Sequence, residues 1–454
     1  MKRLFLSGLL VAMIASPAAL AASTDKPDPA RMQWFADAKL GIFIHWGIYS
    51  VDGVDESWSF HNGKISHADY MEQMDRFTAD LYDPAAWADL ISRSGARYAV
   101  ITTKHHDGVA LWDTELVPGA EPGRPDPPEP LSVAARSPAG RDVIAPFFAE
   151  LRKRGLKAGA YFSLSDWSDP DYPGFTRDST RYRIAEDPQR WQEFLGYCQG
   201  QIREIADRLD PDLWWFDGDW EHDAEEWQAE RVRSLILEAN PRAIINGRLA
   251  GHGDYETPEQ NIPVETPATP WWELCLTIGD EWGWQPQDIA CKSSRDLIAI
   301  FADVIGHGGN LLLDVGPRED GTIPAGQVEV LEEIGRWNAK HAEAVFGTRA
   351  GLPGGHFHGP STLSPDSTAL YLFVPQGAGC SVWIKGLENA VTSVRVVGMD
   401  LELPHRVVGK ISWSRIPGLV FIDVPLMAAD PMLTVLAVEL EGPLRLYRGA
   451  GGLY

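Results

Sequence analysis

Short apolar segments alternate with longer amphipathic segments between residue 40 and about residue 345. The short segments are rich in β-branched and aromatic residues and have the length of strands, whereas the longer segments have helical patterns. Six strands are expected, at Leu40–Trp46, Tyr98–Lys104, Leu156–Leu164, Leu213–Asp217, Ala243–Asn246 and Asn310–Val315. An alternation of this kind is typical of parallel strands joined by crossover helices.

The segments between these strands are expected to be helices, and two of them carry the chemistry of a helix start. Asp83 precedes a proline in one, and Pro324 stands directly ahead of the last. The helices are expected at Pro84–Ser94, Arg141–Arg154, Gln189–Leu209, Glu225–Glu238, Arg295–Gly306 and Ala325–Phe346. The pattern predicts an α/β fold with a (β/α)8-like, TIM-type barrel, regular or distorted, as a catalytic domain over residues 23–347.

After residue 348 the pattern changes to short strands separated by turn residues. These strands are expected at Ala369–Val374, Cys380–Ile384, Val391–Val397, Lys410–Ser414, Val420–Val424 and Thr434–Leu440. Short strands at nearly regular spacing are typical of an antiparallel sandwich. A chain of 454 residues is also too long for one compact core. We therefore expect a C-terminal β-sandwich domain over residues 348–454.

The first 22 residues have the pattern of a cleavable signal peptide. Lys2 and Arg3 precede an apolar run from Leu4 to Ile14, and small residues follow up to Ala22. No other uninterrupted apolar run approaches 18 residues, so insertion into a membrane is not expected. The sequence therefore predicts a secreted or periplasmic protein.

Charge and cysteine content exclude some classes of partner and scaffold. The formal net charge of -24 would repel phosphate backbones, so nucleic acid is not expected as a partner. The four cysteines include no CxxC pair, and disulfides are not expected to form the scaffold. No feature of the sequence indicates the oligomeric state, which is left open.

A carboxylate stands at the end of the most apolar predicted strand. Asp217 ends the segment Leu213–Asp217, and Gly218 then allows the backbone to turn away. Active sites of barrel enzymes are built at the C-terminal ends of the strands. Cleavage of a glycosidic bond needs one carboxylate at the anomeric carbon and a second to protonate the leaving oxygen. The alternative is an aspartate that caps the following helix.

Histidines follow two other predicted strands. His45 ends one of them, and His105 and His106 follow Tyr98–Lys104. These side chains suit sugar hydroxyls or a metal ion, and they are equally compatible with bonds to backbone groups. Adjacent histidines at a strand end point in different directions, which disfavours a shared metal. We therefore expect neither a metal nor another cofactor.

An acidic loop and a group of tryptophans supply further candidates. Glu256 and Glu259 lie in a loop after the strand at 243–246, and Glu281 follows later. A general acid must hold its proton near neutral pH, which an apolar setting favours. Tryptophans such as Trp282 supply that setting, and indole faces also stack on sugar rings, although any single one is as readily explained as core filling.

Six segments occur in order over residues 31–347 and together resemble the α-L-fucosidases of glycoside hydrolase family 29. The segments are LGIFIHWG (40–47), YAVITTKHHDG (98–108), GAYFS (159–163), LWWFDG (213–218), WELCLTIG (272–279) and GGNLLLDVGPREDG (308–321). The resemblance implies a retaining exo-α-L-fucosidase that releases terminal α-L-fucose from fucosylated glycans or oligosaccharides through a covalent fucosyl-enzyme intermediate. It makes Asp217 the nucleophile and Glu259 the acid/base, with Glu256 and Glu281 as alternatives.

The resemblance also implies the residues that bind the sugar. They are His45, Glu56, Trp58, His105, His106, Tyr161, Arg248 and Trp282. One departure concerns Glu56, because many members have an acidic residue immediately before a tryptophan, whereas Ser57 intervenes here. The rival functions are another barrel glycosidase, a metal-dependent hydrolase that uses the three histidines and Asp217, and a catalytically silent carbohydrate-binding protein on the same fold.

Overall fold

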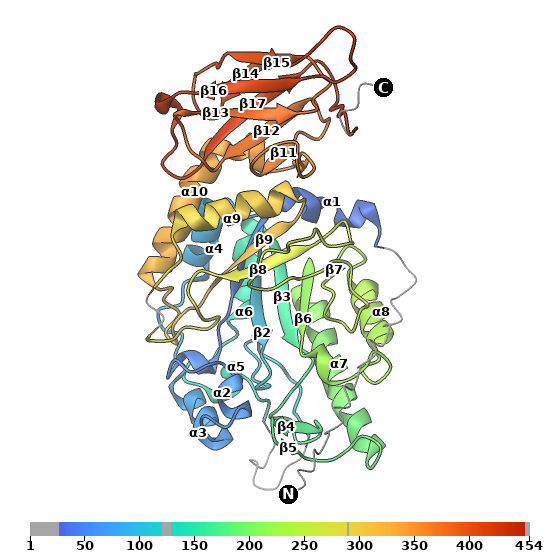
Figure 1. Ribbon diagram of the computed structural model, residues 1–454. Coiled ribbons are helices and arrows are strands. Elements are labelled where there is room, and N and C mark those ends of the chain that lie inside the picture. Colours follow the sequence, from blue (N-terminus) through green and yellow to red (C-terminus); the bar gives the residue numbers. More distant parts are fainter. Residues whose placement is uncertain (1–26, 120–128, 288–289, 450–454) are drawn as a thin grey trace, which may run out of the picture.

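The computed structural model describes residues 27–119, 129–287 and 290–449, and a seven-stranded parallel sheet forms its centre (Figure 1). The strand order is β7-β6-β3-β2-β1-β9-β8, so the first and last strands of the order are β7 and β8. The strands are β1 (Leu40–Ile44), β2 (Tyr98–Lys104), β3 (Lys157–Ser163), β6 (Leu213–Asp217), β7 (Ile244–Ile245), β8 (Glu273–Thr277) and β9 (Asn310–Val315). The predicted TIM-type fold is confirmed, and β8 is a strand that the sequence pattern did not reveal.

The gap between β7 and β8 is filled by an irregular segment, Tyr255–Glu259. Single parallel bridges join it to both neighbours, at Asn246↔Tyr255, Glu256↔Trp272 and Glu259↔Cys275. The Glu273 and Cys275 amides donate to the carbonyls of Glu256 and Pro258 at 2.9 and 3.1 Å. This segment takes the place of the remaining strand of an eight-stranded barrel, and it is where the barrel is distorted.

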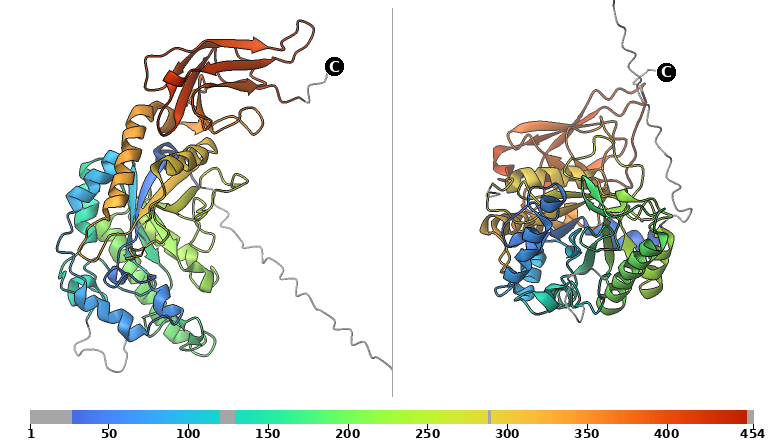
Figure 2. Two further views of the ribbon diagram at one scale, coloured as in Figure 1. Left: turned by 60° about the vertical axis from the view of Figure 1, so that its left-hand side comes forward. Right: turned by 90° about the horizontal axis from the view of Figure 1, so that it is seen from below.

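Helices cover the outside of the sheet, as Figure 2 shows from two further sides. The long ones are α4 (Pro84–Ser94), α6 (Ile144–Lys153), α7 (Pro188–Leu209), α8 (Ala229–Ala239), α9 (Ser294–Gly306) and α10 (Ala325–Val345). Shorter elements are α2 (Trp58–His61), α3 (His67–Met71), α5 (Val133–Arg136), the pair β4 (Gly174–Thr176) and β5 (Ser179–Thr180), and 3₁₀ turns at Ile48–Ser50, Glu72–Arg76, Asp219–Glu221 and Leu426–Ala428. Apolar side chains between the sheet and these helices form the main core.

A second core fills the inside of the curled sheet. Its members include Phe43, Tyr161 and Trp215, which point inward from β1, β3 and β6. Helix α1 (Pro29–Ala38), which the sequence pattern did not predict, contributes Met32 and Phe35 to this core. The barrel interior is therefore packed. One buried carboxyl group, that of Glu273 at the start of β8, accepts there from the Tyr98 hydroxyl and from Trp215 Nε1.

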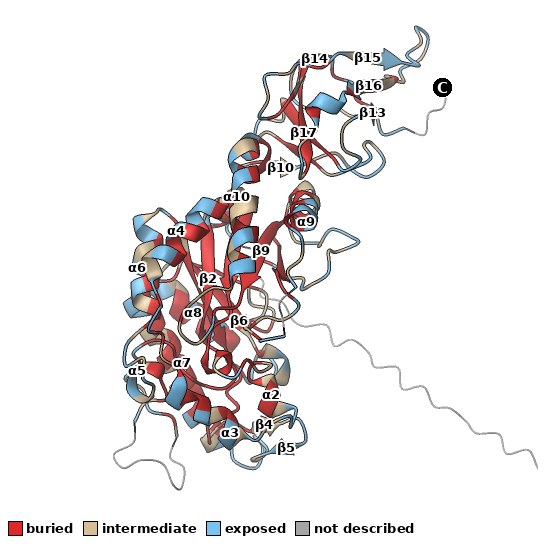
Figure 3. Ribbon diagram, turned by 90° about the vertical axis from the view of Figure 1, so that its left-hand side faces the viewer, coloured by how far each residue is buried: buried red, intermediate tan, exposed pale blue. Residues whose placement is uncertain are grey.

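The C-terminal part consists of two antiparallel sheets, which confirms the predicted sandwich (Figure 1). One sheet has the order β10-β11-β12-β17-β14 and the other β13-β16-β15. The strands are β10 (Arg349–Ala350), β11 (Ser361–Leu363), β12 (Ala369–Val374), β13 (Cys380–Lys385), β14 (Val391–Val396), β15 (His405–Val408), β16 (Leu419–Val424) and β17 (Thr434–Leu440). Burial alternates along β13 and β16, and the inner side chains form a core of their own (Figure 3).

One predicted strand, Lys410–Ser414, is wrong. Residues 409–418 form a loop, and both Gly409 and Gly418 at its ends have a left-handed backbone, with φ of 79° and 85°. The strand that precedes β16 in the chain and pairs with it is β15, directly ahead of this loop, and β13 pairs with the other edge of β16. The loop leaves Trp413 exposed.

The predicted domain limits and the predicted signal peptide both stay predictions. The domain limits at 347 and 348 stay a prediction, although strand pairing changes from parallel to antiparallel between the end of α10 and β10. The predicted signal peptide, residues 1–22, lies outside the described residues. Within the ranges given above, no helix has the length and apolar character needed to cross a membrane.

Candidate active site

A cavity of about 220 Å³ lies at the C-terminal end of the barrel, and nine of the predicted site residues line it. These nine are His45, Glu56, Trp58, His105, Tyr161, Asp217, Arg248, Glu259 and Trp282. Phe43, Trp215 and Trp220 complete the lining. The fold thus brings together side chains that are more than 200 positions apart in the chain.

Asp217 ends β6 and is held by side chains from two other elements. The Tyr161 hydroxyl donates to Asp217 Oδ2 at 2.9 Å, and Arg248 Nη1 donates to Oδ1 at 2.9 Å. Gly218 turns the chain with a φ of 77°, and a Cβ at this position would lie 2.6 Å from Ser165 Oγ. The carboxylate is therefore fixed at a defined place in the cavity wall.

Arg248 connects this carboxylate to Glu259. Its Nη2 donates to Glu259 Oε2 at 2.6 Å, and its guanidinium lies 4.5 Å from the ring centre of Trp215. Burial acts to lower the pKa of Arg248, but the Asp217 carboxylate and its other neighbours hold it above its ordinary value. The guanidinium therefore stays charged and donates a hydrogen bond to each of the two carboxyl groups.

His45 is oriented by Asp314, a residue that sequence reasoning missed. The His45 Nδ1 lies 2.7 Å from Asp314 Oδ1, and both side chains are buried. Burial and the neighbouring His105 lower the pKa of His45 well below its ordinary value. A neutral imidazole that donates from Nδ1 has an acceptor at Nε2, which suits a hydroxyl donor.

His106 carries its proton on the same ring nitrogen as His45, Nδ1, although His106 lies behind the cavity wall. Its Nδ1 is 2.5 Å from Ser163 Oγ, whose hydroxyl donates to the Ser165 carbonyl at 2.6 Å. Because the serine proton is used, Nδ1–H of His106 donates and Nε2 is the bare nitrogen. That nitrogen lies 3.6 Å from Asp217 Oδ2. Burial and the neighbouring His61 lower the pKa of His106, so its ring is neutral.

His105 stacks on Tyr161 with ring centres 5.6 Å apart and planes 7° apart. Its Nδ1 is hydrogen-bonded to Ser57 Oγ. Burial and the neighbouring His106 lower the pKa of His105 well below its ordinary value. Three neutral imidazoles therefore lie side by side at this end of the barrel.

The insertion of Ser57 between Glu56 and Trp58 is accommodated locally. Glu56 has a φ of 28°, and both Glu56 and Trp58 line the cavity while Ser57 turns back to His105. The Gly283 amide donates to Glu56 Oε1 at 2.6 Å. Burial raises the pKa of Glu56 to about 8. This carboxyl group therefore carries a proton near neutral pH.

The other acidic candidates lie outside the cavity lining. Glu256 is exposed and faces a neighbouring hollow, and Glu281 is not among the described residues that line the cavity. Asp254, in the same loop, is buried in ion pairs with Arg31 and Arg233, at 2.5 and 2.8 Å. Glu259 is thus the acid of this loop that reaches the cavity.

Two lining residues that were missed had a signal in the sequence. Trp215 lies two positions before Asp217, and Phe43 lies two positions before His45. Side chains two apart on a strand share a face. Ser163, two positions after Tyr161 on β3, had the same signal, whereas Asp314 had none, because its partner His45 is 269 positions away.

A family model described as alpha-L-fucosidase matches residues 13–343. The chain belongs to the α-L-fucosidase family. It is therefore a glycoside hydrolase by family.

Relatives of this fucosidase chain agree in sequence and in structure. The tissue alpha-L-fucosidase of Macaca fascicularis is 27% identical over 446 residues, covering 90% of this chain and 86% of that protein. The structure of alpha-L-fucosidase isoenzyme 1 from Paenibacillus thiaminolyticus is 28% identical with a TM-score of 0.79, covering 90% and 99% of the two chains. The structure of the Thermotoga maritima alpha-fucosidase in complex with a mechanism based inhibitor is 28% identical with a TM-score of 0.71, covering 90% and 96%.

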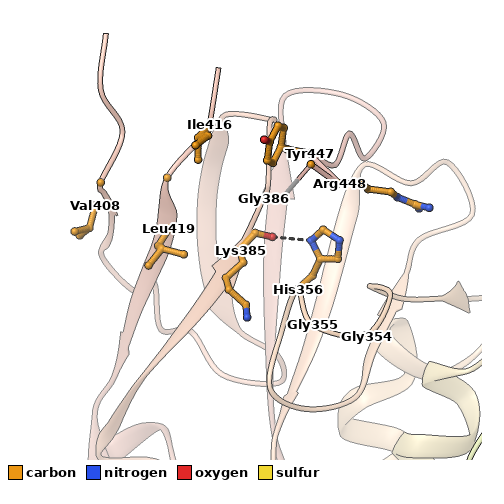
Figure 4. Close-up of a pocket in the computed structure, with 13 residues that line it drawn as sticks. Gly354, Gly355, His356, Lys385, Gly386, Val408, Ile416, Leu419, Tyr447 and Arg448 are labelled. Atoms are coloured by element: carbon orange, nitrogen blue, oxygen red, sulfur yellow. Dashed lines mark hydrogen bonds between the residues drawn. The ribbon is translucent and has the colours of Figure 1, made fainter. Parts of the chain in front are cut away.

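A second, larger cavity of about 580 Å³ lies in the sandwich of this fucosidase chain (Figure 4). Of the described residues that line it, none is Asp or Glu. The cationic ends of Lys385 and Arg448 point away from each other. Since glycoside cleavage uses paired carboxylates, this cavity lacks the required groups.

Among residues 27–119, 129–287 and 290–449, no group of three or more His, Cys, Asp or Glu side chains is arranged to hold a metal ion. In the fucosidase site, the nitrogens His45 Nδ1 and His106 Nδ1 are already engaged by Asp314 and Ser163.

Proposed function

We propose that this chain hydrolyses terminal α-L-fucosides with retention at the anomeric carbon, with Asp217 as nucleophile and Glu259 as acid/base. The observation that carries the proposal is the pair of carboxylates joined by Arg248 at the rim of a cavity that two neutral histidines, His45 and His105, also line. Asp217 Oδ1 and Glu259 Oε2 accept from the two terminal nitrogens of one guanidinium, so only that group and two hydrogen bonds lie between them. Such proximity is compatible with the roughly 5 to 5.5 Å between carboxyl groups in retaining enzymes.

The first step forms the fucosyl-enzyme. One oxygen of Asp217 attacks C1 of fucose while the bond from C1 to the leaving oxygen breaks. The leaving oxygen takes the bond electrons and a proton from Glu259, which must carry it on Oε1, the oxygen that does not face Arg248. Tyr161 and Arg248 donate to Asp217 and orient it for attack.

The second step restores the enzyme. The ionised Glu259 removes a proton from a water molecule, and the water oxygen attacks C1. The bond between C1 and Asp217 breaks, and its electrons return to the carboxylate. Two displacements at the same carbon give net retention.

The remaining polar groups suit the hydroxyls of one sugar. His45 presents an acceptor nitrogen to the cavity, whereas Glu56, which is protonated near neutral pH, presents a donor. The contact of His106 with the sugar stays a prediction, because this residue is not part of the cavity lining. We assign His105 and Trp58 to the same sugar and Trp282 to its apolar face, since the indole lies 4.9 Å from the His45 ring centre. A cavity of about 220 Å³ is smaller than those that hold drug-sized ligands, which favours a single terminal sugar and hence exo-action.

The proposal is tested by fucose release from an aryl α-L-fucoside, with Asp217→Ala and Glu259→Ala compared in the presence of azide. We expect Asp217→Ala to lose activity by several orders of magnitude and to form a β-fucosyl azide. Glu259→Ala should form an α-fucosyl azide. Glu256→Ala and Glu281→Ala are matched controls, and azide rescue of either would transfer the acid/base role to it.

Two further outcomes separate the rival functions. Loss of activity with a chelator would favour the metal-dependent hydrolase. A wild type that is silent on the aryl fucoside and on a panel of fucosylated oligosaccharides, yet binds them, would favour the carbohydrate-binding protein.

We also propose that the chain is exported, to the periplasm or the medium. Support comes from the basic and apolar pattern of residues 1–22. N-terminal sequencing of the protein from its native compartment tests this, because cleavage next to Ala22 is expected and an intact Met1 in the mature protein would contradict it.

A further inference from the structure

Trp220 is a large apolar side chain left in contact with solvent at the edge of the active-site cavity. It lines that cavity, yet 54% of its surface is exposed. It lies three residues after Asp217, in the 3₁₀ turn Asp219–Glu221. Its indole therefore offers an apolar surface to solvent directly beside the polar groups of the site.

The indole ring of Trp220 packs against two neighbouring side chains. It stacks on Trp58 with ring centres 6.1 Å and planes 15° apart, and its edge meets His106 at 5.6 Å. One stacked face is therefore occupied by Trp58.

The turn that carries Trp220 is anchored on both sides. Glu221 accepts from Trp167 Nε1 at 2.7 Å and from the Tyr172 hydroxyl at 2.6 Å. Asp219 accepts from the Ala250 amide at 2.9 Å. A preorganised aromatic surface loses little conformational entropy when a ligand binds to it.

The size of the cavity determines where the leaving group lies. A cavity of about 220 Å³ that holds the fucose leaves the rest of the substrate outside, at the rim. Of the residues that line the cavity, Trp220 and Glu259 are the two that are exposed, at 54% for the whole Trp220 residue and 40% for the Glu259 side chain. The leaving oxygen must be close to Glu259 for protonation.

We propose that Trp220 is the binding platform for the leaving group and thereby determines which fucosides are preferred. This inference rests on the proposed function. The exposed indole surface would pack on the apolar C–H face of a pyranose ring, or on an aromatic ring, attached to the fucose oxygen. Leaving groups without a ring would gain nothing from it.

The test compares Trp220→Ala with wild type on three substrates of the intact chain: a fucosylated disaccharide, an aryl α-L-fucoside and α-L-fucosyl fluoride. Fluoride has no ring to stack. We expect kcat/KM of Trp220→Ala to fall by about 3- to 10-fold on the first two substrates and to stay unchanged on the fluoride. Trp220→Phe should retain most of the activity because it keeps an aromatic face.

The matched control is Trp413→Ala, which removes another exposed tryptophan, on the loop at 409–418 of the sandwich. It should leave all three substrates unchanged. Binding of a fucose-configured iminosugar without a leaving group gives a second readout, and its affinity should be equal in wild type and Trp220→Ala.

Other results overturn the inference. An equal fall on all three substrates, with weaker iminosugar binding, would mean that Trp220 supports the fucose site through Trp58 and His106. No change on any substrate would mean that the leaving group does not contact it. If the wild type cleaves none of the three, the proposed function itself fails, and this result is distinct from the other two.

Discussion

Asp217 and Glu259 accept hydrogen bonds from the same guanidinium, that of Arg248, through different nitrogen atoms at 2.9 and 2.6 Å. One residue thus sets the distance between the two carboxylates on which the proposed chemistry depends. A lysine in its place would be a point charge with no planar fork, and it could not hold both carboxylates in this arrangement.

Arg248→Lys is therefore expected to lower kcat/KM by about 10- to 100-fold, because charge-assisted hydrogen bonds of this kind contribute about 1.5–3 kcal/mol each. Steady-state kinetics on an aryl fucoside measures this. Arg231→Lys, on the exposed surface of α8, is the control and should behave as wild type. Full activity of Arg248→Lys would show that the shared guanidinium is dispensable.

Asp314→Ala is expected to raise KM about 10-fold, since it removes the acceptor that fixes the tautomer and orientation of His45. Asp314→Asn keeps an oxygen acceptor for Nδ1–H and should retain most of the affinity. Both variants are compared by inhibitor binding as well as by kinetics. Equal behaviour of the two variants would contradict an orienting role for this bond.

Glu56→Gln is expected to stabilise the protein at pH 8 but not at pH 4. Burial raises the pKa of Glu56 from 4.5 to about 8 in the native state, so between these values the native state binds one more proton than the unfolded state. That difference makes native stability fall as pH rises from 4.5 to 8, by a few kcal/mol at most, because each pKa unit corresponds to about 1.4 kcal/mol.

Thermal unfolding of both proteins across this pH range measures the effect. The other buried acids are present in both proteins and cancel in the difference. A difference in Tm that does not change with pH would mean that Glu56 has the same pKa in the native and unfolded states.

Gly218→Ala is expected to destabilise the protein more than Gly347→Ala. Both glycines have φ near 70°, at 77° and 71°, but a Cβ on Gly218 meets Ser165 Oγ at 2.6 Å, whereas nothing lies within 4 Å of one on Gly347. The Gly347 variant thus measures the backbone cost alone, about 1 kcal/mol. Denaturant unfolding should give a larger loss for Gly218→Ala, together with reduced activity because Asp217 is adjacent. Equal losses would indicate that Ser165 moves away freely.

The regular parts of the fold were predictable because their signals are local. The bounds of β2, β6 and β9 match the sequence prediction, since strands buried on both faces read as continuous apolar runs. Helix α4 was predicted to the residue, with the Asp83 side chain accepting from the Ala85 amide at its start and Gly95 in a left-handed conformation at its end.

The contacts that orient the site could not be predicted in this way. Ser57 and His105 are 48 positions apart, and His45 and Asp314 are 269 apart. Such partners are chosen by the packing of the barrel and leave no periodicity in the chain. The Tyr255–Glu259 segment was missed as part of the barrel because it has no run of β-branched or apolar residues.

The irregular segment at 255–259 affects which parts of this chain can tolerate changes in sequence and length. Asp217 ends a strand that pairs with β3 along its whole length and with β7 over its first two residues, whereas Glu259 stands on a stretch joined to the barrel by isolated bridges. Insertions, deletions or a different loop course near Glu259 would break few backbone bonds, while the same changes at β6 would disrupt the sheet. The architecture therefore separates the proposed nucleophile, fixed in the sheet, from the proposed proton donor, whose position in the chain is free to shift, so new leaving groups can be accommodated without rebuilding the sugar pocket.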